Sequence, residues 1–96
     1  MTAYMIARVN VTNPEQYEEY KKLSPGAIAK YDGRFLVRGG DMATLEGPEC
    51  SERVILVEFP SMERAKEFYN SEDYQHAISV REGAAEAQFI LIDGLE

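Results

Sequence analysis

The stretch RVILVEFPS, residues 53–61, is the clearest strand-to-helix unit in this sequence. Its apolar run at residues 54–57, followed by Phe59, is typical of a central strand with both faces occupied. Pro60 predicts the end of that strand, because proline has no N–H to donate to a neighbouring strand. Ser61 then occupies the position of a helix N-cap. We therefore expect a strand over residues 53–59 and a helix over residues 62–69.

Residues 3–11 alternate between two sets of side chains and predict a first strand. The segment NPEQ at residues 13–16 combines an N-cap, a proline at the first helical position and a capping-box glutamine. Apolar residues at helical spacing continue this helix as far as Tyr31. Because proline disrupts a helix interior, the segment SPG at residues 24–26 predicts a kink or a short second helix capped by Ser24.

Further strands are predicted at residues 34–38 and 88–92, and a short strand is possible at residues 42–45. Ser71 is expected to cap a helix that follows the one at residues 62–69. One side of that helix would carry Tyr74, Ala77, Ile78, Arg81 and Ala85.

The predicted order is strand, helix, strand, strand, helix, strand, within a single domain covering residues 1–96. With right-handed crossovers, this order gives an α+β, ferredoxin-like βαββαβ fold: a four-stranded antiparallel sheet with helices on one face. If Met5, Ala7 and Val9 contact the helices, then Tyr4 and Ile6 lie on the uncovered face, together with Leu36 and Leu56. An apolar face of this kind usually marks an interface. We expect two sheets to pack face to face in a symmetric homodimer.

Composition excludes several partners. The net charge of −7 argues against nucleic acid, which requires clustered Lys and Arg, and against an anionic membrane surface. No apolar stretch approaches the length of a membrane span, roughly 20 residues, and no signal peptide is recognisable. The one cysteine, Cys50, forms no internal disulfide and lies in an acidic loop that makes it a poor nucleophile. We expect a cytoplasmic protein.

Three charged residues share the parity of the uncovered sheet face: Arg8, Arg38 and Glu58. Buried charges need partners, so we expect Arg8 or Arg38 to pair with Glu58. An ion pair that stabilises the dimer interface is the favoured interpretation. The alternative is an arginine presented to an anionic or carbonyl-bearing ligand, with Glu58 as its orienting group or as a general base.

Other candidate residues have a structural and a functional interpretation. His76, the only histidine, lies off the apolar stripe of its helix, so exposure is favoured over a zinc or haem site. Gly39 and Gly40 favour a bulge or tight turn, although they could bring backbone N–H groups close to a ligand. Tyr74 and Arg81 could line a cavity mouth. The same applies to the hydroxyl groups of Tyr17, Tyr20, Tyr31 and Tyr69, for which core packing is favoured.

Several parts of the sequence carry a resemblance to a known family: residues 53–61, Ala65, the stretch YNSEDYQ at 69–75, and Arg81. Together they resemble the signature of domain-of-unknown-function family 1330. The segments RGG at 38–40 and LEG at 45–47 match the earlier part of that signature, and a frequent tryptophan position falls on Phe68 or Tyr69. The resemblance covers essentially the whole chain and implies a dimeric α/β barrel. Related barrels include cofactor-free monooxygenases, haem-processing proteins, lactone isomerases and dehydratases, which is an analogy of fold.

The leading hypothesis is a homodimer that binds a small organic molecule between the sheet and the helices of each subunit, without a cofactor or metal. The residues expected to line this pocket are Arg38, Glu58, Tyr69, Tyr74 and Arg81. The proposed ligand-binding residues are Arg38, Gly39, Tyr69, Tyr74 and Arg81, and Glu58 is the candidate catalytic residue. Whether the protein is an enzyme stays open. One alternative is a cofactor-free isomerase, dehydratase or monooxygenase that uses Glu58 or a tyrosine for proton transfer. A second is an assembly module without a ligand.

Overall fold

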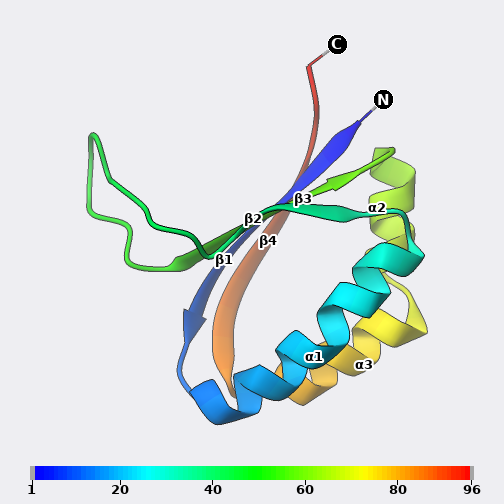
Figure 1. Ribbon diagram of the computed structural model, residues 1–96, viewed down its shortest axis with the longest axis horizontal. Helices are drawn as coiled ribbons and strands as arrows, with labels where there is room; N and C mark the ends of the chain where they lie inside the picture. The colour runs from blue at the N-terminus through cyan, green and yellow to red at the C-terminus, as the bar shows by residue number, and fades with distance from the viewer. Residues whose placement is uncertain (1, 96) are drawn as a thin grey trace.

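The computed structural model describes residues 2–95, which form a four-stranded antiparallel sheet with three helices on one side (Figure 1). The strand order is β2-β3-β1-β4, so the stretch at residues 53–59 is a central strand as predicted. This is the expected ferredoxin-like fold. In chain order, the elements are β1 (Ala3–Val11), α1 (Pro14–Lys30), β2 (Arg34–Arg38), β3 (Arg53–Phe59), α2 (Met62–Tyr69), α3 (Glu72–Arg81) and β4 (Ala85–Asp93).

The core lies between the sheet and the helices. On β1, Met5, Ala7 and Val9 face the helices and are buried, as the alternating pattern predicts. On the helix side, α2 and α3 begin at the predicted N-caps, where the Ser61 and Ser71 hydroxyl groups accept backbone N–H bonds. The helices contribute buried aromatic rings: Tyr17, Tyr20, Phe68 and Tyr74.

Helix α1 continues through Pro25, so the alternative of a second short helix is wrong. Proline has no N–H, and the carbonyl group four residues earlier, at Lys21, therefore loses its helical donor. The guanidinium group of Arg38 donates to this carbonyl oxygen at 3.4 Å. A side chain from β2 thus replaces a hydrogen bond that proline removes.

Strand β2 contains a bulge at Leu36. Phe35 pairs with Val57 and Val37 pairs with Leu56, so Leu36 is the extra residue. The bulge reverses the parity of the last residue, Arg38, which faces the helices instead of the uncovered face. The predicted placement of Arg38 on the uncovered face is wrong for this reason.

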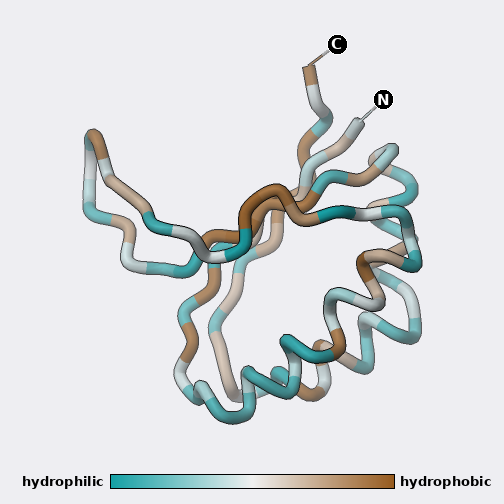
Figure 2. The backbone as a smooth tube through the Cα atoms, in the orientation of Figure 1, coloured by the Kyte–Doolittle hydropathy of each residue, from teal (hydrophilic) through white to brown (hydrophobic). Residues whose placement is uncertain are grey.

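Two predicted boundaries also differ from the structure. The possible strand at residues 42–45 is absent, because the segment between β2 and β3 is irregular and exposed. This segment projects from the sheet, and its tip is hydrophobic (Figures 1 and 2). Within the segment, Leu45 is 94% exposed. Helix α3 ends at Arg81, so Ala85 belongs to β4, which is longer than predicted.

The uncovered face of the sheet carries an apolar row that crosses all four strands. Ile90, Ile6, Leu56 and Val37 are successive partners in the register from β4 to β2. Ile90 and Ile92 are 44% and 52% exposed. Among residues 2–95, no helix has the length and apolar character that crossing a membrane requires.

Candidate functional site

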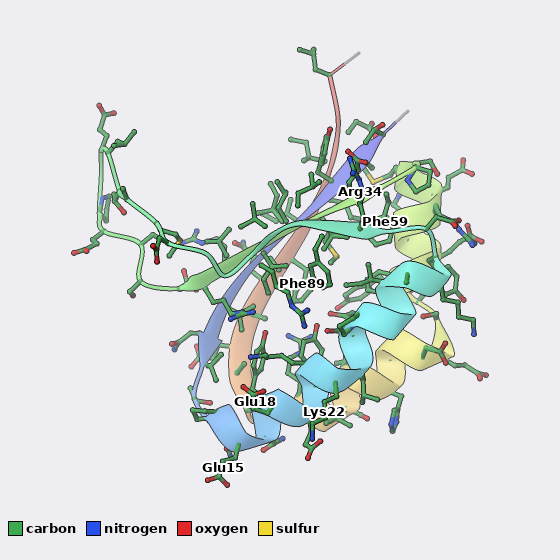
Figure 3. All side chains as sticks on the ribbon, in the orientation of Figure 1. Glu15, Glu18, Lys22, Arg34, Phe59 and Phe89 are labelled. Atoms are coloured by element: carbon green, nitrogen blue, oxygen red, sulfur yellow. The ribbon has the colours of Figure 1, made fainter. Side chains whose placement is uncertain are left out.

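A cleft of about 410 Å³ opens between the edge strand β4 and helices α2 and α3. Its walls are largely apolar, and the Phe89 side chain lies between the sheet and the helices (Figure 3). Polar groups come from the end of α2 and the last turn of α3. The lining residues are Met5, Lys66, Tyr69, Asn70, Arg81, Ala87, Phe89 and Leu91. This combination of apolar walls and a few polar groups is typical of small-molecule sites.

Arg81 is the most unusual residue of the cleft, because it is charged and only 8% exposed. Its guanidinium carbon lies 5.0 Å from the ring centroids of both Tyr20 and Phe89. Its Nε atom is buried and has no hydrogen-bond partner among the described residues. Arg81 thus lines a cavity, at the position that was predicted for it.

Tyr69 lines the cleft and is 37% exposed, whereas the ring of Tyr74 lies behind it and is fully buried. The two ring centroids are 5.6 Å apart. The Tyr74 hydroxyl forms a buried hydrogen bond with the Tyr20 hydroxyl. Tyr74 therefore supports the wall of the cleft from inside and does not line it.

Burial raises the pKa of Tyr74 and of Tyr20 above the ordinary value for tyrosine. It also raises the pKa of Tyr17, against the opposing effect of the positive charges of Arg53, Arg81 and Arg38. These tyrosines are held neutral.

Arg38 and Arg53 line a smaller hollow beneath β2 and β3, which shares Met5 and Phe89 with the cleft. The hollow measures about 20 Å³, room for one water molecule. Gly39 has φ +68°, and a side-chain carbon there would lie 2.7 Å from the Arg53 guanidinium group. Its N–H donates to the Val54 carbonyl. Gly39 therefore makes room for Arg53 just after β2, where the chain bends.

Glu58 lies on the uncovered face, where it pairs with Arg34 at 2.9 Å across β2 and β3. Figure 3 shows Arg34 on the side of the sheet away from α1. Arg8 pairs instead with Glu52 at 2.7 Å. The expected pairing of Glu58 with Arg8 or Arg38 is therefore wrong. Its placement in a pocket between sheet and helices is also wrong, whereas a catalytic role for Glu58 stays an untested prediction.

Several lining residues of the cleft were not predicted from the sequence: Met5, Lys66, Asn70, Ala87, Phe89 and Leu91. The parity of the edge strand could have found three of them, because Ala87, Phe89 and Leu91 pair with Val9, Ala7 and Met5, which face the helices. Lys66 and Asn70 had no such signal, since exposed polar residues at a helix end are common.

His76 is exposed on α3, as predicted. Within the described range, residues 2–95, no three His, Cys, Asp or Glu side chains gather closely enough to hold a metal ion.

The strand order, the antiparallel pairing and the one-sided helices define a ferredoxin-like α+β protein. The chain belongs to the family of the domain of unknown function DUF1330, whose model matches residues 2–95. The comparison with curated proteins found no match.

Solved structures have the same fold. A protein of unknown function from Rhodopseudomonas palustris is 20% identical with a TM-score of 0.80, over 99% of this chain and 83% of that one. SnoaB, a cofactor-independent oxygenase from Streptomyces nogalater, is 10% identical with a TM-score of 0.70, over 99% and 94%. A dimeric ferredoxin-like protein of unknown function from Thermobifida fusca is 12% identical with a TM-score of 0.59, over 96% and 90%. At these identities the likeness concerns the fold.

Proposed function

We propose that this protein is a homodimer in which each subunit binds a small organic molecule in the cleft between β4, α2 and α3. The observation that carries the proposal is the cleft itself, whose volume of about 410 Å³ falls within the range of small-molecule sites. Tyr69 and Arg81 contact the ligand directly. Tyr74, Arg38 and Gly39 act from behind, by fixing the walls that the ligand contacts.

The dimer forms through the uncovered sheet face. The apolar row Ile90, Ile6, Leu56 and Val37 supports this, because a monomer would leave it in water. The charges beside the row are neutralised within the subunit by the pairs Arg8–Glu52 and Arg34–Glu58. A second copy can therefore cover the row without burying an unpaired charge. The ferredoxin-like protein from Thermobifida fusca, which is dimeric, supports a dimer by likeness of fold. A cytoplasmic location is part of this proposal.

An enzyme of cofactor-free type is the second candidate, because SnoaB, a cofactor-independent oxygenase, has the same fold. Proton transfer at neutral pH needs a group whose pKa lies near 7. Tyr20 and Tyr74 fit poorly, since burial moves their pKa values further from neutrality. Glu58 lies on the other face of the sheet. Among the predicted proton-transfer groups, only Tyr69 lines the cleft, and no carboxylate or histidine of the described chain lines it beside Tyr69, so we favour binding without turnover.

The ligand proposal is tested by filling the cleft. Ala87→Trp places a large ring at the β4 wall, whereas Glu63→Trp places the same ring on the exposed side of α2 and serves as the matched control. We expect a library of small aromatic and aliphatic acids, amides and alcohols, screened by ligand-observed NMR, to yield binders of the wild type. Those binders should be lost in Ala87→Trp and kept in Glu63→Trp.

Binders that are unaffected by Ala87→Trp would contradict the cleft as their site. A library without any binder, on a protein that circular dichroism shows to be folded and light scattering shows to be a dimer, would favour the assembly module.

A further inference from the structure

The cationic side chains of this protein divide into two groups. The chain has 10 Lys and Arg residues. One group forms ion pairs with carboxylates: Arg8, Lys21, Lys22, Lys30, Arg34 and Arg64. Within residues 2–95, the other group forms none, and every member lines the cleft or the small hollow beside it: Arg38, Arg53, Lys66 and Arg81. Neither space is lined by an Asp or Glu of the described chain.

Arg81 carries the argument furthest, because it is more than nine-tenths buried and lines the larger space. A buried charge without a partner is costly, and most proteins pair it. The contacts with the Tyr20 and Phe89 rings offset part of this cost through cation–π attraction. Such contacts do not use the N–H donors, and the buried Nε of Arg81 has no acceptor among the described residues.

The other unpaired cations differ from Arg81 in what surrounds them. Arg38 donates to the Lys21 carbonyl that Pro25 leaves free, so it has a structural partner. Arg53, like Arg81, has a buried Nε without a hydrogen-bond partner among the described residues, but it faces a hollow with room for only one water. Lys66 is exposed at the mouth of the cleft, where its charge can attract an anion from solution.

We infer that the ligand of this cleft is a small organic carboxylate with an apolar or aromatic body. The inference rests on the proposed function and specifies its ligand class. The carboxylate accepts N–H bonds from Arg81, whose planar fork matches two oxygen atoms. The apolar body packs against Met5, Phe89 and Leu91, and Lys66 closes the outer end.

The charge of the whole chain supports this class of ligand. With a net charge of −7, the protein repels anions over most of its surface. A carboxylate that enters the cleft nevertheless meets two cations, Arg81 and Lys66, and no lining carboxylate of the described chain. The site therefore selects for an anion against the overall charge of the molecule.

The test compares 2-naphthoate with 2-naphthamide, which have nearly the same shape and differ in charge. We expect isothermal titration calorimetry to show wild type binding 2-naphthoate at least about tenfold more tightly than 2-naphthamide. This preference should weaken as salt concentration rises. The comparison uses the unaltered protein and does not depend on any variant.

Two variants then locate the preference. Arg81→Gln should bring the two affinities within about twofold of each other. Arg64→Gln removes a cation from α2 that is already paired with Asp32 and Glu67, and should leave the preference unchanged. Circular dichroism establishes that each variant is folded. If Arg81→Gln does not fold, Lys66→Gln at the exposed mouth takes its place, with a smaller expected loss of preference.

Equal binding of 2-naphthoate and 2-naphthamide would overturn the inference and leave the proposed ligand cleft standing. Binding of neither probe at millimolar concentration would overturn the inference, and the proposed function falls with it if the small-molecule library also yields no binder. A naphthoate preference that survives Arg81→Gln and Lys66→Gln unchanged would overturn the inference too, since the anion would then bind elsewhere.

Discussion

The two faces of the sheet differ in how their charged side chains are neutralised. On the uncovered face, Arg8 and Arg34 each have a carboxylate within hydrogen-bond distance. On the helix-covered face, Arg81 is more deeply buried and has no carboxylate partner in the described chain. Exposed pairs add little stability, and a buried unpaired charge reduces it. The unpaired charge therefore lies where stability alone would not place it, and this supports the proposed ligand.

The largest expected effect is a difference in stability loss between substitutions on the two faces of the sheet, because only the helix-covered face is packed within the subunit. Phe68→Ala, in the core beneath the covered face, should lower the free energy of unfolding by about 3–5 kcal/mol. Ile90→Ala, on the uncovered face, should cost far less within a subunit because its side chain is 44% exposed. Because Ile90 also lies in the proposed dimer interface, urea unfolding of both variants is measured in a protein made monomeric by Leu56→Asp. Equal losses would contradict the difference between the faces.

The next effect concerns the uncovered face. Leu56→Asp places a charge in the middle of the apolar row, and we expect it to convert the proposed dimer to monomers, because a buried unpaired carboxylate costs several kcal/mol. Size-exclusion chromatography with light scattering gives the mass. His76→Asp adds the same charge on the exposed side of α3 and should leave a dimer. A Leu56→Asp dimer would refute the proposed interface.

A third effect comes from the tyrosines of the covered face. Burial raises the folded-state pKa of Tyr17, Tyr20 and Tyr74 above the value of about 10 in the unfolded chain. The folded state then holds these protons more tightly. The contribution of these tyrosines to the free energy of unfolding is therefore fully present below about pH 10 and falls as pH rises further. Unfolding measured across that pH range should show this loss, and Tyr74→Phe should reduce it. Stability that stays constant would contradict the burial of these hydroxyls.

The smallest effect is expected for Glu58→Ala. This change removes the pair with Arg34, whose side chain is largely exposed, so we expect a loss of less than about 1 kcal/mol. The variant should remain a dimer and keep its affinity for 2-naphthoate. A loss of affinity for 2-naphthoate in this variant would show that Glu58 takes part in ligand binding.

Much of the fold could be predicted from the sequence, because its signals are local. The apolar run at residues 54–57, the caps Ser61 and Ser71, and the alternation in β1 each specify an element or a face without any long-range contact. The two faces of β1 follow from the same alternation. The family resemblance agreed with the fold that these patterns predict.

The candidate site was less predictable, because it depends on the register between strands and on contacts between residues that are distant in the sequence. The bulge at Leu36 turns the Arg38 side chain from the uncovered face of the sheet to the helix-covered face. The local sequence pattern does not indicate this extra residue. The pairing of Glu58 with Arg34 follows only from the β2–β3 register. The continuity of α1 at Pro25 depends on packing and on the distant Arg38.

The central claim is that the unpaired guanidinium group of Arg81 receives an anion. The most direct measurement is a titration of ¹⁵N-labelled protein with 2-naphthoate, following backbone amides and the arginine Nε–H signals. We predict that the Arg81 Nε–H signal and the Asn70 and Phe89 amides shift together, while the amides of Ile6 and Leu56 stay fixed. Shifts confined to the uncovered face, or an Arg81 signal that does not move while the protein binds, would contradict the claim.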